Sequence, residues 1–262
     1  MMSRVEWTAH DGVELAYERT GSGPRLLFLN GSGTTMAASP LLRAPFSKSF
    51  EVLTLDLRGI GESTIPDEPF TMAHCAADAR AVMDHVGWDT CSVLGISFGG
   101  MVAQELAVTV PERIERLALL CTSAGGAGGS SYPLHDSPAT ETVLDTRFTP
   151  EWLAEHRRDA TLVEFMAKRR DEAKSDEVRR GERAQLEARR HHDVWDRLDR
   201  ITAPTFVAGG RFDGLAPFAN SEAIASRIPD AELHGYEGGH AFFVQDPQAF
   251  PEVIAFLTGT TR

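Results

Sequence analysis

The chain has 262 residues and a formal net charge of −12, a length that suits one main α/β domain with a large core. Such an acidic chain repels phosphate backbones and anionic lipid surfaces, so we expect a small-molecule partner, no nucleic acid and no membrane. Residues 1–12 contain no apolar export segment, and no run approaches the roughly 18 apolar residues of a membrane span, so we expect a cytoplasmic protein.

The elements are predicted in chain order from hydrophobic periodicity. Two alternating segments around Asp11-Gly12 predict an N-terminal hairpin. Five short apolar runs are then typical of strands buried on both faces, namely 25–29, 51–57, 91–96, 116–121 and 203–210. Helical patterns separate most of them or follow them, at 71–87, 98–110, 220–228 and 250–257. Strands alternating with helices predict a mostly parallel sheet covered on both sides.

The alternation breaks between about Ala124 and Arg200. The break opens with the Gly/Ser-rich segment SAGGAGGSSYP and continues with a helical, densely charged stretch. A long excursion without strands is more often a functional lid than a plain loop. We therefore expect residues 1–125 and 201–262 to form the core domain and residues 126–200 to form a helical cap.

The cysteines do not indicate a disulfide framework or a metal centre. Cys75, Cys91 and Cys121 are odd in number, widely spaced and without a C-x-x-C pair. Cys91 and Cys121 lie in apolar runs, so we expect buried thiols there.

The segment GISFGG, residues 95–100, places Ser97 in a G-x-S-x-G pattern. This pattern is typical of the sharp turn that exposes a nucleophilic serine between a strand and a helix. The apolar run 91–96 precedes Ser97, and the helical pattern 98–110 follows it. A serine at a strand-to-helix junction also suits a helix N-cap, so the pattern alone leaves both interpretations open.

A serine nucleophile needs a base, and the base needs an acid to orient it. Asp213 comes just after the strand pattern 203–210, and His240 follows a short final strand and two glycines. Both fall at the same edge of the sheet, in the order serine, acid, histidine. The competing acids lack that placement, since Asp56 comes too early and three others lie in the insertion, namely Asp193, Asp196 and Asp199. We therefore predict Ser97, Asp213 and His240 as the catalytic residues.

The other histidines are not expected to act in catalysis or metal binding. His191 and His192 are neighbours on a helical stretch and would point to different faces, so we expect a solvated or pocket-rim pair. The remaining six have no motif around them and are expected to be surface or satisfied residues: His10, His74, His85, His135, His156 and His234.

Six blocks in order carry a resemblance that covers nearly the whole chain outside the insertion: NGSG (30–33), DLRGIGES (56–63), GISFGG (95–100), PERIERLALL (111–120), GRFDGLAP (210–217) and GGHAFFVQDP (238–247). The chain resembles the α/β-hydrolase superfamily, closest to the group of 3-oxoadipate enol-lactonases, small-molecule esterases and cofactor-free haloperoxidases. The resemblance implies an α/β fold with a mostly parallel eight-stranded sheet, helices on both faces and an inserted helical cap, with no cofactor and no metal ion.

The sequence departs from this family in one block. The family usually has His-Gly after its third strand, whereas this chain has Asn30-Gly31. The resemblance implies an oxyanion hole made of the backbone N–H groups of Ser32 and Phe98. The helix that begins after Ser97 adds a favourable potential for negative charge.

The expected reaction is hydrolysis of a small-molecule carboxylic ester or lactone through an acyl-enzyme. C–C bond hydrolysis, perhydrolysis or haloperoxidase-type activity, acyl transfer to an alcohol and a non-enzymatic receptor on the same fold are the alternatives left open. A possible homo-oligomer is left open as well.

The substrate pocket is expected to include Asn30, Gly31, Trp152 and Trp195. In the insertion, Trp152, Trp195, Phe165 and Met166 either form an apolar roof or simply pack. The arginines of the insertion either clamp a substrate carboxylate or lie on solvated helix faces: Arg169, Arg170, Arg179, Arg180, Arg189 and Arg190.

Overall fold

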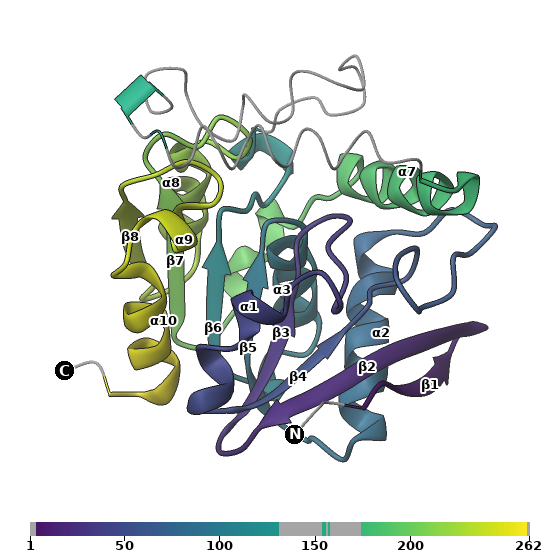
Figure 1. Ribbon diagram of the computed structural model, residues 1–262. Helices are drawn as coiled ribbons and strands as arrows, with labels where there is room; N and C mark the ends of the chain where they lie inside the picture. Colours follow the sequence, from purple (N-terminus) through teal and green to yellow (C-terminus); the bar gives the residue numbers. More distant parts are fainter. Residues whose placement is uncertain (1–3, 131–153, 156, 158–173, 261–262) are drawn as a thin grey trace.

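The computed structural model describes residues 4–130, 154, 155, 157 and 174–260. Its centre is an eight-stranded sheet with the order β1-β2-β4-β3-β5-β6-β7-β8 (Figure 1). The strands are β1 (Glu6–His10), β2 (Val13–Gly21), β3 (Arg25–Leu29), β4 (Glu51–Leu55), β5 (Cys91–Ile96), β6 (Ile114–Leu120), β7 (Thr205–Gly210) and β8 (Glu232–Tyr236). β2 runs antiparallel to β1 and β4, and all other neighbours are parallel. The predicted mostly parallel sheet is confirmed.

The N-terminal hairpin follows from its turn residues. Asp11 and Gly12 have φ angles of 49° and 72°, and positive φ at both central positions matches the right-handed twist of the paired strands. Trp7 pairs with Ala16 and Thr8 with Leu15 across β1 and β2. The predicted hairpin is therefore confirmed.

Alternate residues of the parallel strands enter two different cores. In β3, Leu27 and Leu29 belong to one buried cluster, and Leu26 and Phe28 belong to the other. This is the period of two expected for a strand buried on both faces.

Helices cover the two faces of the sheet (Figure 1). The first cluster takes side chains from α2 (Met72–His85), α3 (Phe98–Thr109) and α8 (Phe218–Arg227). The second takes them from η1 (Phe46–Lys48), α9 (Phe242–Gln245) and α10 (Ala249–Thr258), with Leu42 of α1 (Pro40–Arg43) packed against it. The 3-10 turn η2 (Pro111–Arg113) leads into β6. The helices predicted at 71–87, 98–110, 220–228 and 250–257 are all present.

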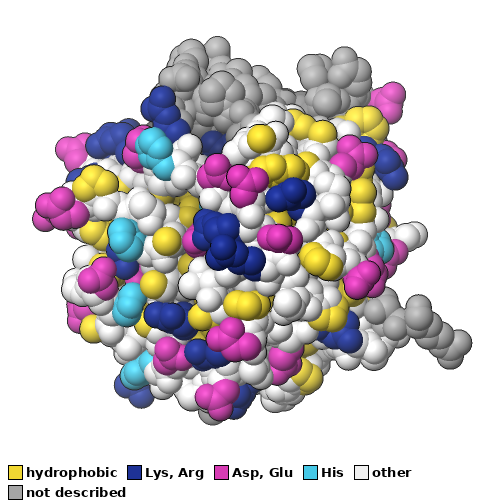
Figure 2. Space-filling view, turned by 180° about the vertical axis from the view of Figure 1, so that it is seen from behind, with side chains coloured by type: hydrophobic (Ala, Val, Ile, Leu, Met, Phe, Trp, Pro, Cys, Tyr) yellow, Lys and Arg dark blue, Asp and Glu magenta, His cyan; other side chains and the backbone are white. Residues whose placement is uncertain are grey.

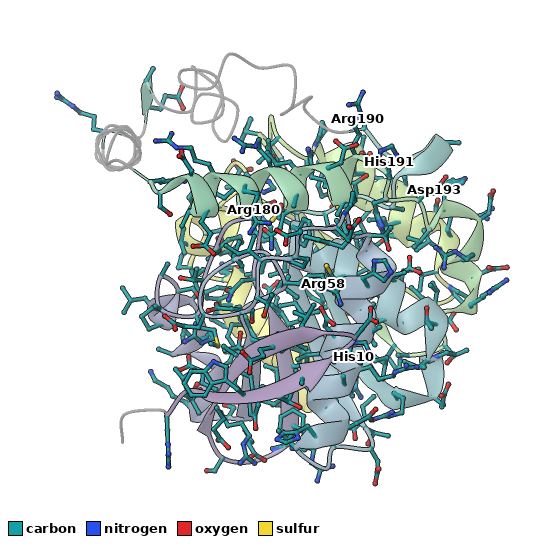
Figure 3. All side chains as sticks on the ribbon, turned by 90° about the vertical axis from the view of Figure 1, so that its right-hand side faces the viewer. His10, Arg58, Arg180, Arg190, His191 and Asp193 are labelled. Atoms are coloured by element: carbon teal, nitrogen blue, oxygen red, sulfur yellow. The ribbon has the colours of Figure 1, made fainter. Side chains whose placement is uncertain are left out.

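The described part of the insertion contains η3 (Gly126–Gly128), α7 (Asp176–Arg190) and η4 (Trp195–Arg200). Ser175 Oγ caps α7 by accepting the Val178 N–H at 3.2 Å, as expected for a helix N-cap. α7 lies across the end of the molecule above β2 and α2 (Figures 1 and 3). The N-cap residue of η4, Val194, is buried in the first core cluster, and so is Leu198 within η4. The last residues of the insertion therefore pack with the core.

The order of the strands makes a topological switch point at β3. The chain moves from β3 to β4 on one side and then to β5 on the other, so the loops that leave β3 and β5 at their carboxyl ends diverge. Open α/β sheets bind ligands at such a switch point. Residues 30–33 and Ser97 follow these two strands directly.

On the face shown in Figure 2, Lys and Arg side chains are interspersed with Asp and Glu, as expected for a chain with many charged residues of both signs. Within the part of the chain that the structure describes, no helix is long and apolar enough to cross a membrane.

The three cysteines, Cys75, Cys91 and Cys121, are buried free thiols.

Candidate active site

Ser97 lies in a strained turn between β5 and α3. Its φ and ψ angles are 53° and −113°, a region that only glycine visits without strain. Its N–H donates to Leu120 O at 2.8 Å, and its carbonyl oxygen accepts from Gly100 N–H and Thr122 Oγ1 at 2.9 and 2.8 Å. The Ser97 side chain makes no capping hydrogen bond to α3, which removes the argument for Ser97 as a conventional N-cap.

Two glycines allow this turn to form. A Cβ atom at Gly95 would overlap the carbonyl oxygen of Gly99, and one at Gly99 would overlap the carbonyl oxygen of Leu29. Helix α3 therefore begins in direct backbone contact with the ends of β3 and β5. The two glycines of the G-x-S-x-G pattern are therefore required because any side chain there would overlap the neighbouring backbone.

The structure brings Ser97, His240 and Asp213 into one chain of hydrogen bonds. His240 Nε2 lies 3.0 Å from Ser97 Oγ, and His240 Nδ1 lies 2.8 Å from Asp213 Oδ2. In the tautomer that carries its proton on Nδ1, toward the carboxylate, Nε2 presents its lone pair to the Ser97 hydroxyl. The three residues come from the loops after β5, β7 and β8, as the sequence predicts.

Asp213 is held as a buried acceptor. Its Oδ1 accepts the N–H groups of Leu215 and Ala216, each at 2.8 Å. Its side chain is completely buried, whereas 13% of the His240 side chain is exposed. These contacts fix the orientation of the carboxylate toward the imidazole.

The loop after β3 lies beside Ser97. An ideal Cβ atom on Gly31 would lie 3.7 Å from Ser97 Cβ. Thr34 N–H donates to Gly31 O at 3.1 Å, and Gly33 N–H donates to Gln185 Oε1 at 3.0 Å, so the backbone around Ser32 is held from two sides. Phe98 is the first residue of α3, and an N–H at that position has no acceptor within its own helix.

Asn30, which stands where the family usually has histidine, is buried beside this loop. It is 2% exposed, and within the described residues neither amide atom has a hydrogen-bond partner. Buried amides are normally satisfied. Asn30 is therefore the one predicted pocket residue that offers unused polar groups in the described part of the site.

Of the two tryptophans predicted for the pocket, the structure describes Trp195 but not Trp152. Phe165 and Met166 also lie outside the described residues. Trp195 packs its ring against Gly128, where a Cβ atom would overlap it, and under the Arg227 guanidinium at 5.0 Å. These contacts favour the packing interpretation of Trp195.

One of the arginines of α7, Arg180, has several structural partners. Arg180 donates to Pro66 O at 2.9 Å, to Asp67 Oδ1 at 2.6 Å and to Ile65 O at 3.2 Å. Burial lowers the pKa of Arg189, and Arg190 is exposed and points away from the core (Figure 3). Arg180 thus joins α7 to the segment before α2. Arg169 and Arg170 lie outside the described residues.

The histidine pair differs from expectation at one position. His191 is exposed and lies 2.9 Å from Glu187. His192 is only 6% exposed, and burial lowers its pKa to about 4. The solvated alternative is therefore wrong for His192, because its ring is buried where the end of α7 joins the core, and the pocket-rim alternative stays a prediction.

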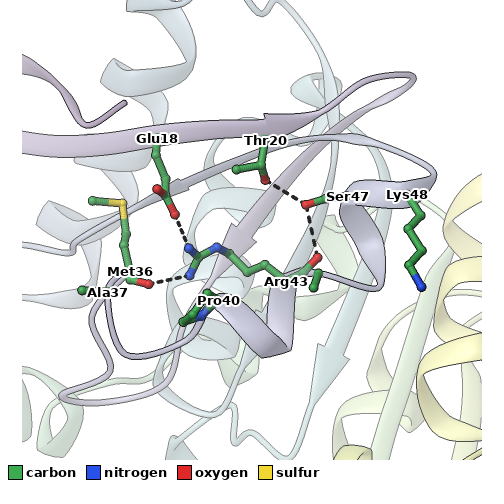
Figure 4. Close-up of a pocket in the computed structure, with 9 residues that line it drawn as sticks. Glu18, Thr20, Met36, Ala37, Pro40, Arg43, Ser47 and Lys48 are labelled. Carbon is green, nitrogen blue, oxygen red and sulfur yellow. Dashed lines mark hydrogen bonds and ion pairs between the residues drawn. The ribbon is translucent and has the colours of Figure 1, made fainter. Parts of the chain in front are cut away.

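A hollow of about 410 Å³ lies away from this site (Figure 4). Its lining includes Glu18 and Arg43, whose side chains form a buried ion pair, and Arg43 also donates to Met36 O at 2.9 Å. None of Ser97, Asp213 and His240 lines it. Because the Arg43 head group is already bonded within the protein, this hollow supplies no obvious reactive group.

Comparison with known proteins now decides the family. Residues 24–164 match the model of the alpha/beta hydrolase fold family. The chain belongs to this family. It is 27% identical over 257 residues to 3-oxoadipate enol-lactonase 2 of Acinetobacter baylyi, covering 94% of this chain and 93% of the relative. It is 30% identical over 250 residues to a poly(3-hydroxyalkanoate) depolymerase of Ectopseudomonas oleovorans, covering 88% and 83%.

A solved structure agrees with these relatives. The enol-lactonase from Burkholderia xenovorans superposes with a TM-score of 0.81 at 26% identity, covering 97% of this chain and all of that one (100%). The chain is therefore a hydrolase of the alpha/beta fold, as the resemblance implied.

Sequence reasoning missed three residues that surround the site. Gln185 of α7 contacts Gly33, Thr122 after β6 holds the Ser97 carbonyl, and Gln104 of α3 donates to Gly100 O and Ser123 O at 3.0 and 3.1 Å. None of them belongs to a local motif. Only the polar character of Gln104 within a largely apolar helix could have drawn attention to it.

Proposed function

We propose that this protein hydrolyses a small-molecule carboxylic ester or lactone, with Ser97 as nucleophile, His240 as base and Asp213 as orienting acid. The observation that carries the proposal is the pair of contacts at His240, 3.0 Å to Ser97 Oγ and 2.8 Å to Asp213 Oδ2. A serine hydroxyl becomes a nucleophile only when such a base accepts its proton.

The first half of the reaction forms an acyl-enzyme. Ser97 Oγ attacks the substrate carbonyl carbon while its proton passes to His240 Nε2. The tetrahedral oxyanion accepts hydrogen bonds from the backbone N–H groups of Ser32 and Phe98, at the N-terminus of α3. The intermediate then collapses, the C–O bond to the leaving oxygen breaks, and His240 returns its proton to that oxygen.

The second half regenerates the enzyme. His240 Nε2 takes a proton from water, and the hydroxide attacks the acyl carbon. The new tetrahedral intermediate releases the carboxylic acid, and Ser97 Oγ recovers its proton from His240. Asp213 stays ionised throughout and stabilises the imidazolium that forms twice.

The substrate class is supported by the relatives. One of them is named for a lactone and the other for a poly(3-hydroxyalkanoate), and both compounds contain carboxylic ester bonds. The net charge of −12 also suits a small-molecule substrate better than a polyanion.

We further propose that residues 126–200 act as a cap over this site, on the core formed by 1–125 and 201–262. Supporting contacts come from α7, where a Cβ atom at Gly181 would overlap the carbonyl oxygen of Gly59 and where Gln185 bonds Gly33. Near the end of this segment, Val194 and Leu198 are buried in the core, which attaches the proposed cap to the core domain.

The test is a turnover panel of acyl esters of varied chain length, simple lactones and an enol-lactone, measured for the native enzyme, Ser97→Ala and Ser226→Ala. Ser226 is an exposed serine of α8 and serves as the matched control. We expect Ser97→Ala to lose about 10⁴-fold or more in kcat and Ser226→Ala to stay near the native rate. Native-like ester hydrolysis by Ser97→Ala would refute the proposed nucleophile.

The same panel separates the other chemistries. Adding a C–C substrate of the vinylogous 1,5-diketone type and hydrogen peroxide tests C–C hydrolysis and perhydrolysis. A single turnover per molecule, with a stable acylated protein in mass spectrometry, would indicate a receptor rather than an enzyme.

A further inference from the structure

The buried side chain of Cys121 lies beside the Asp213–His240 pair. Cys121 Sγ, a carboxylate oxygen of Asp213 and a ring nitrogen of His240 all lie within 4.8 Å of one another. We propose that these three residues form an inhibitory binding site for a borderline-soft divalent cation, such as Zn²⁺ or Cd²⁺. The binding does not depend on the proposed function, whereas the inhibition rests on it.

The fold holds Cys121 in this place. Cys121 directly follows β6, has a φ angle of 42° and donates its N–H to Ala208 O of β7 at 2.8 Å. Asp213 follows the same strand β7, so the two side chains meet at the carboxyl edge of neighbouring strands. Positive φ is strained for a residue other than glycine and persists only where surrounding contacts hold it, here the bond to Ala208 O, which also holds the thiol at the site.

The resting thiol is protonated and unreactive. Burial raises the pKa of Cys121 well above its ordinary value, and the Asp213 carboxylate raises it further. Cys121 is therefore a poor nucleophile in the free protein. A bound metal ion reverses this preference, because a coordinated thiol loses its proton.

The donor set selects the kind of ion. Sulfur, imidazole nitrogen and carboxylate oxygen together suit Zn²⁺ and its heavier relative Cd²⁺, whereas Mg²⁺ and Ca²⁺ prefer oxygen ligands. Tetrahedral Zn²⁺ with bond lengths of about 2.0 to 2.3 Å needs ligand atoms roughly 3.3 to 3.6 Å apart. Side-chain movements of about 1 Å would bring the three atoms to that spacing, leaving a fourth position for water.

Binding would remove the base of the proposed reaction. The metal–sulfur bond forms as the Cys121 proton leaves to solvent, and the imidazole keeps one proton on the nitrogen that does not bind. If Nδ1 binds, that proton lies on Nε2, which can no longer accept the Ser97 proton. If Nε2 binds, its lone pair is already used. Either geometry stops proton transfer from Ser97.

Access should make the inhibition slow. Cys121 is 1% exposed and the Asp213 side chain is fully buried, whereas His240 retains 13% exposure. A hydrated ion would therefore meet His240 first and reach the other two ligands only after losing water. We expect time-dependent inhibition that a chelator reverses.

The experiment compares the native protein with Cys121→Ser and Cys121→Ala, using Cys75→Ala and Cys91→Ala as matched controls. Cys75 and Cys91 are also buried free thiols, and neither belongs to the group. Cd²⁺ titration without substrate follows the ultraviolet charge-transfer band of a cadmium–thiolate bond, and a parallel assay follows ester hydrolysis in Zn²⁺ or Mg²⁺.

We expect the cadmium–thiolate band in the native protein and both controls, and its loss in both Cys121 variants. The Zn²⁺ concentration for half-inhibition should rise at least tenfold in the Cys121 variants, and Mg²⁺ should not inhibit. Absence of the band in the folded native protein, or equal Zn²⁺ inhibition with and without Cys121, would overturn the proposal. Because the band needs no turnover, failure of the proposed hydrolase activity leaves this test intact.

Discussion

Gln185 of α7 accepts a hydrogen bond from the Gly33 N–H at 3.0 Å, although the two residues are 152 positions apart. The same side chain donates from Nε2 to Arg58 O at 3.3 Å and is 1% exposed. Gly33 directly follows Ser32, whose N–H is one of the two proposed oxyanion donors. The described helix of the insertion is thus bonded to the loop that would stabilise the transition state.

Replacing Gln185 should therefore lower kcat more than it changes KM. Gln185→Met keeps the size of the side chain but removes the acceptor of Gly33 N–H. We expect kcat to fall by about 10- to 100-fold, as for a donor displaced by a fraction of an ångström. Gln185→Glu keeps an acceptor for the Gly33 N–H but loses the donor to Arg58 O, so it should recover only part of the rate.

Steady-state kinetics on one ester substrate checks this prediction. Arg183→Met, on an exposed position of α7, is the matched control and should behave like the native enzyme. Equal kcat values for Gln185→Met and the control would show that the contact does not position the loop.

Asp213→Asn tests the identity of the acid. Asparagine can keep the acceptor for Leu215 and Ala216 N–H, so the fold should be preserved. Its amide would present an N–H to His240 and favour the wrong tautomer, and we expect kcat to fall by about 10⁴-fold. Asp199→Asn, on an exposed residue of the insertion, should leave kcat unchanged. A large loss in Asp199→Asn with a small one in Asp213→Asn would exchange the two assignments.

The parts of the molecule that were predictable from sequence have local causes. The strands follow from apolar runs, the hairpin from Asp11-Gly12, and the positions of Ser97, Asp213 and His240 from their places just after strands. Parallel strands bring such positions to one edge whatever the intervening chain does.

The contacts that were not predictable join distant segments through single side chains. The Gln185–Gly33 bond has no sequence pattern, because a glutamine on a charged helix is normally solvent-exposed. The nearness of Cys121 to Asp213 depends on the register of β6 against β7. The burial of His192 depends on how the end of α7 turns into the core, which residue type alone does not indicate.

Asp78 is expected to be a major determinant of stability. Its fully buried carboxylate accepts Arg58 Nε and Nη2 at 2.5 and 2.7 Å and lies 2.8 Å from His10 Nδ1. Figure 3 shows Arg58 and His10 on this side of the molecule. Asp78→Asn leaves the buried Arg58 charge uncompensated and should lower the free energy of unfolding by about 3–5 kcal/mol.

Urea unfolding at neutral pH measures the effect of Asp78→Asn. The matched control is Asp84→Asn, since Asp84 also pairs with an arginine, Arg113 at 2.7 Å, but its side chain is 55% exposed. An exposed pair is worth roughly 0–1 kcal/mol. Similar unfolding midpoints for the two variants would contradict the role assigned to the buried pair.

His192 should make the protein less stable in mild acid. Burial lowers its pKa to about 4, with the Glu105 carboxylate opposing that shift, whereas an unfolded histidine has a pKa of about 6.5. Between these values the unfolded chain binds the extra proton, so stability falls as the pH falls below about 6.5 and the loss levels off below about 4. From pH 7 to pH 5 this one group should remove about 2 kcal/mol from the free energy of unfolding.

His192→Gln, which keeps a polar side chain of similar length but does not titrate, isolates this contribution. Urea unfolding of the native protein and the variant at pH 7 and pH 5 should show a smaller pH dependence in the variant by that amount. His191→Gln is the matched control, because His191 is exposed at the neighbouring position, and it should retain the native pH dependence. If His192→Gln lost as much stability on acidification as the control, His192 would have to titrate in the folded protein much as it does in the unfolded chain.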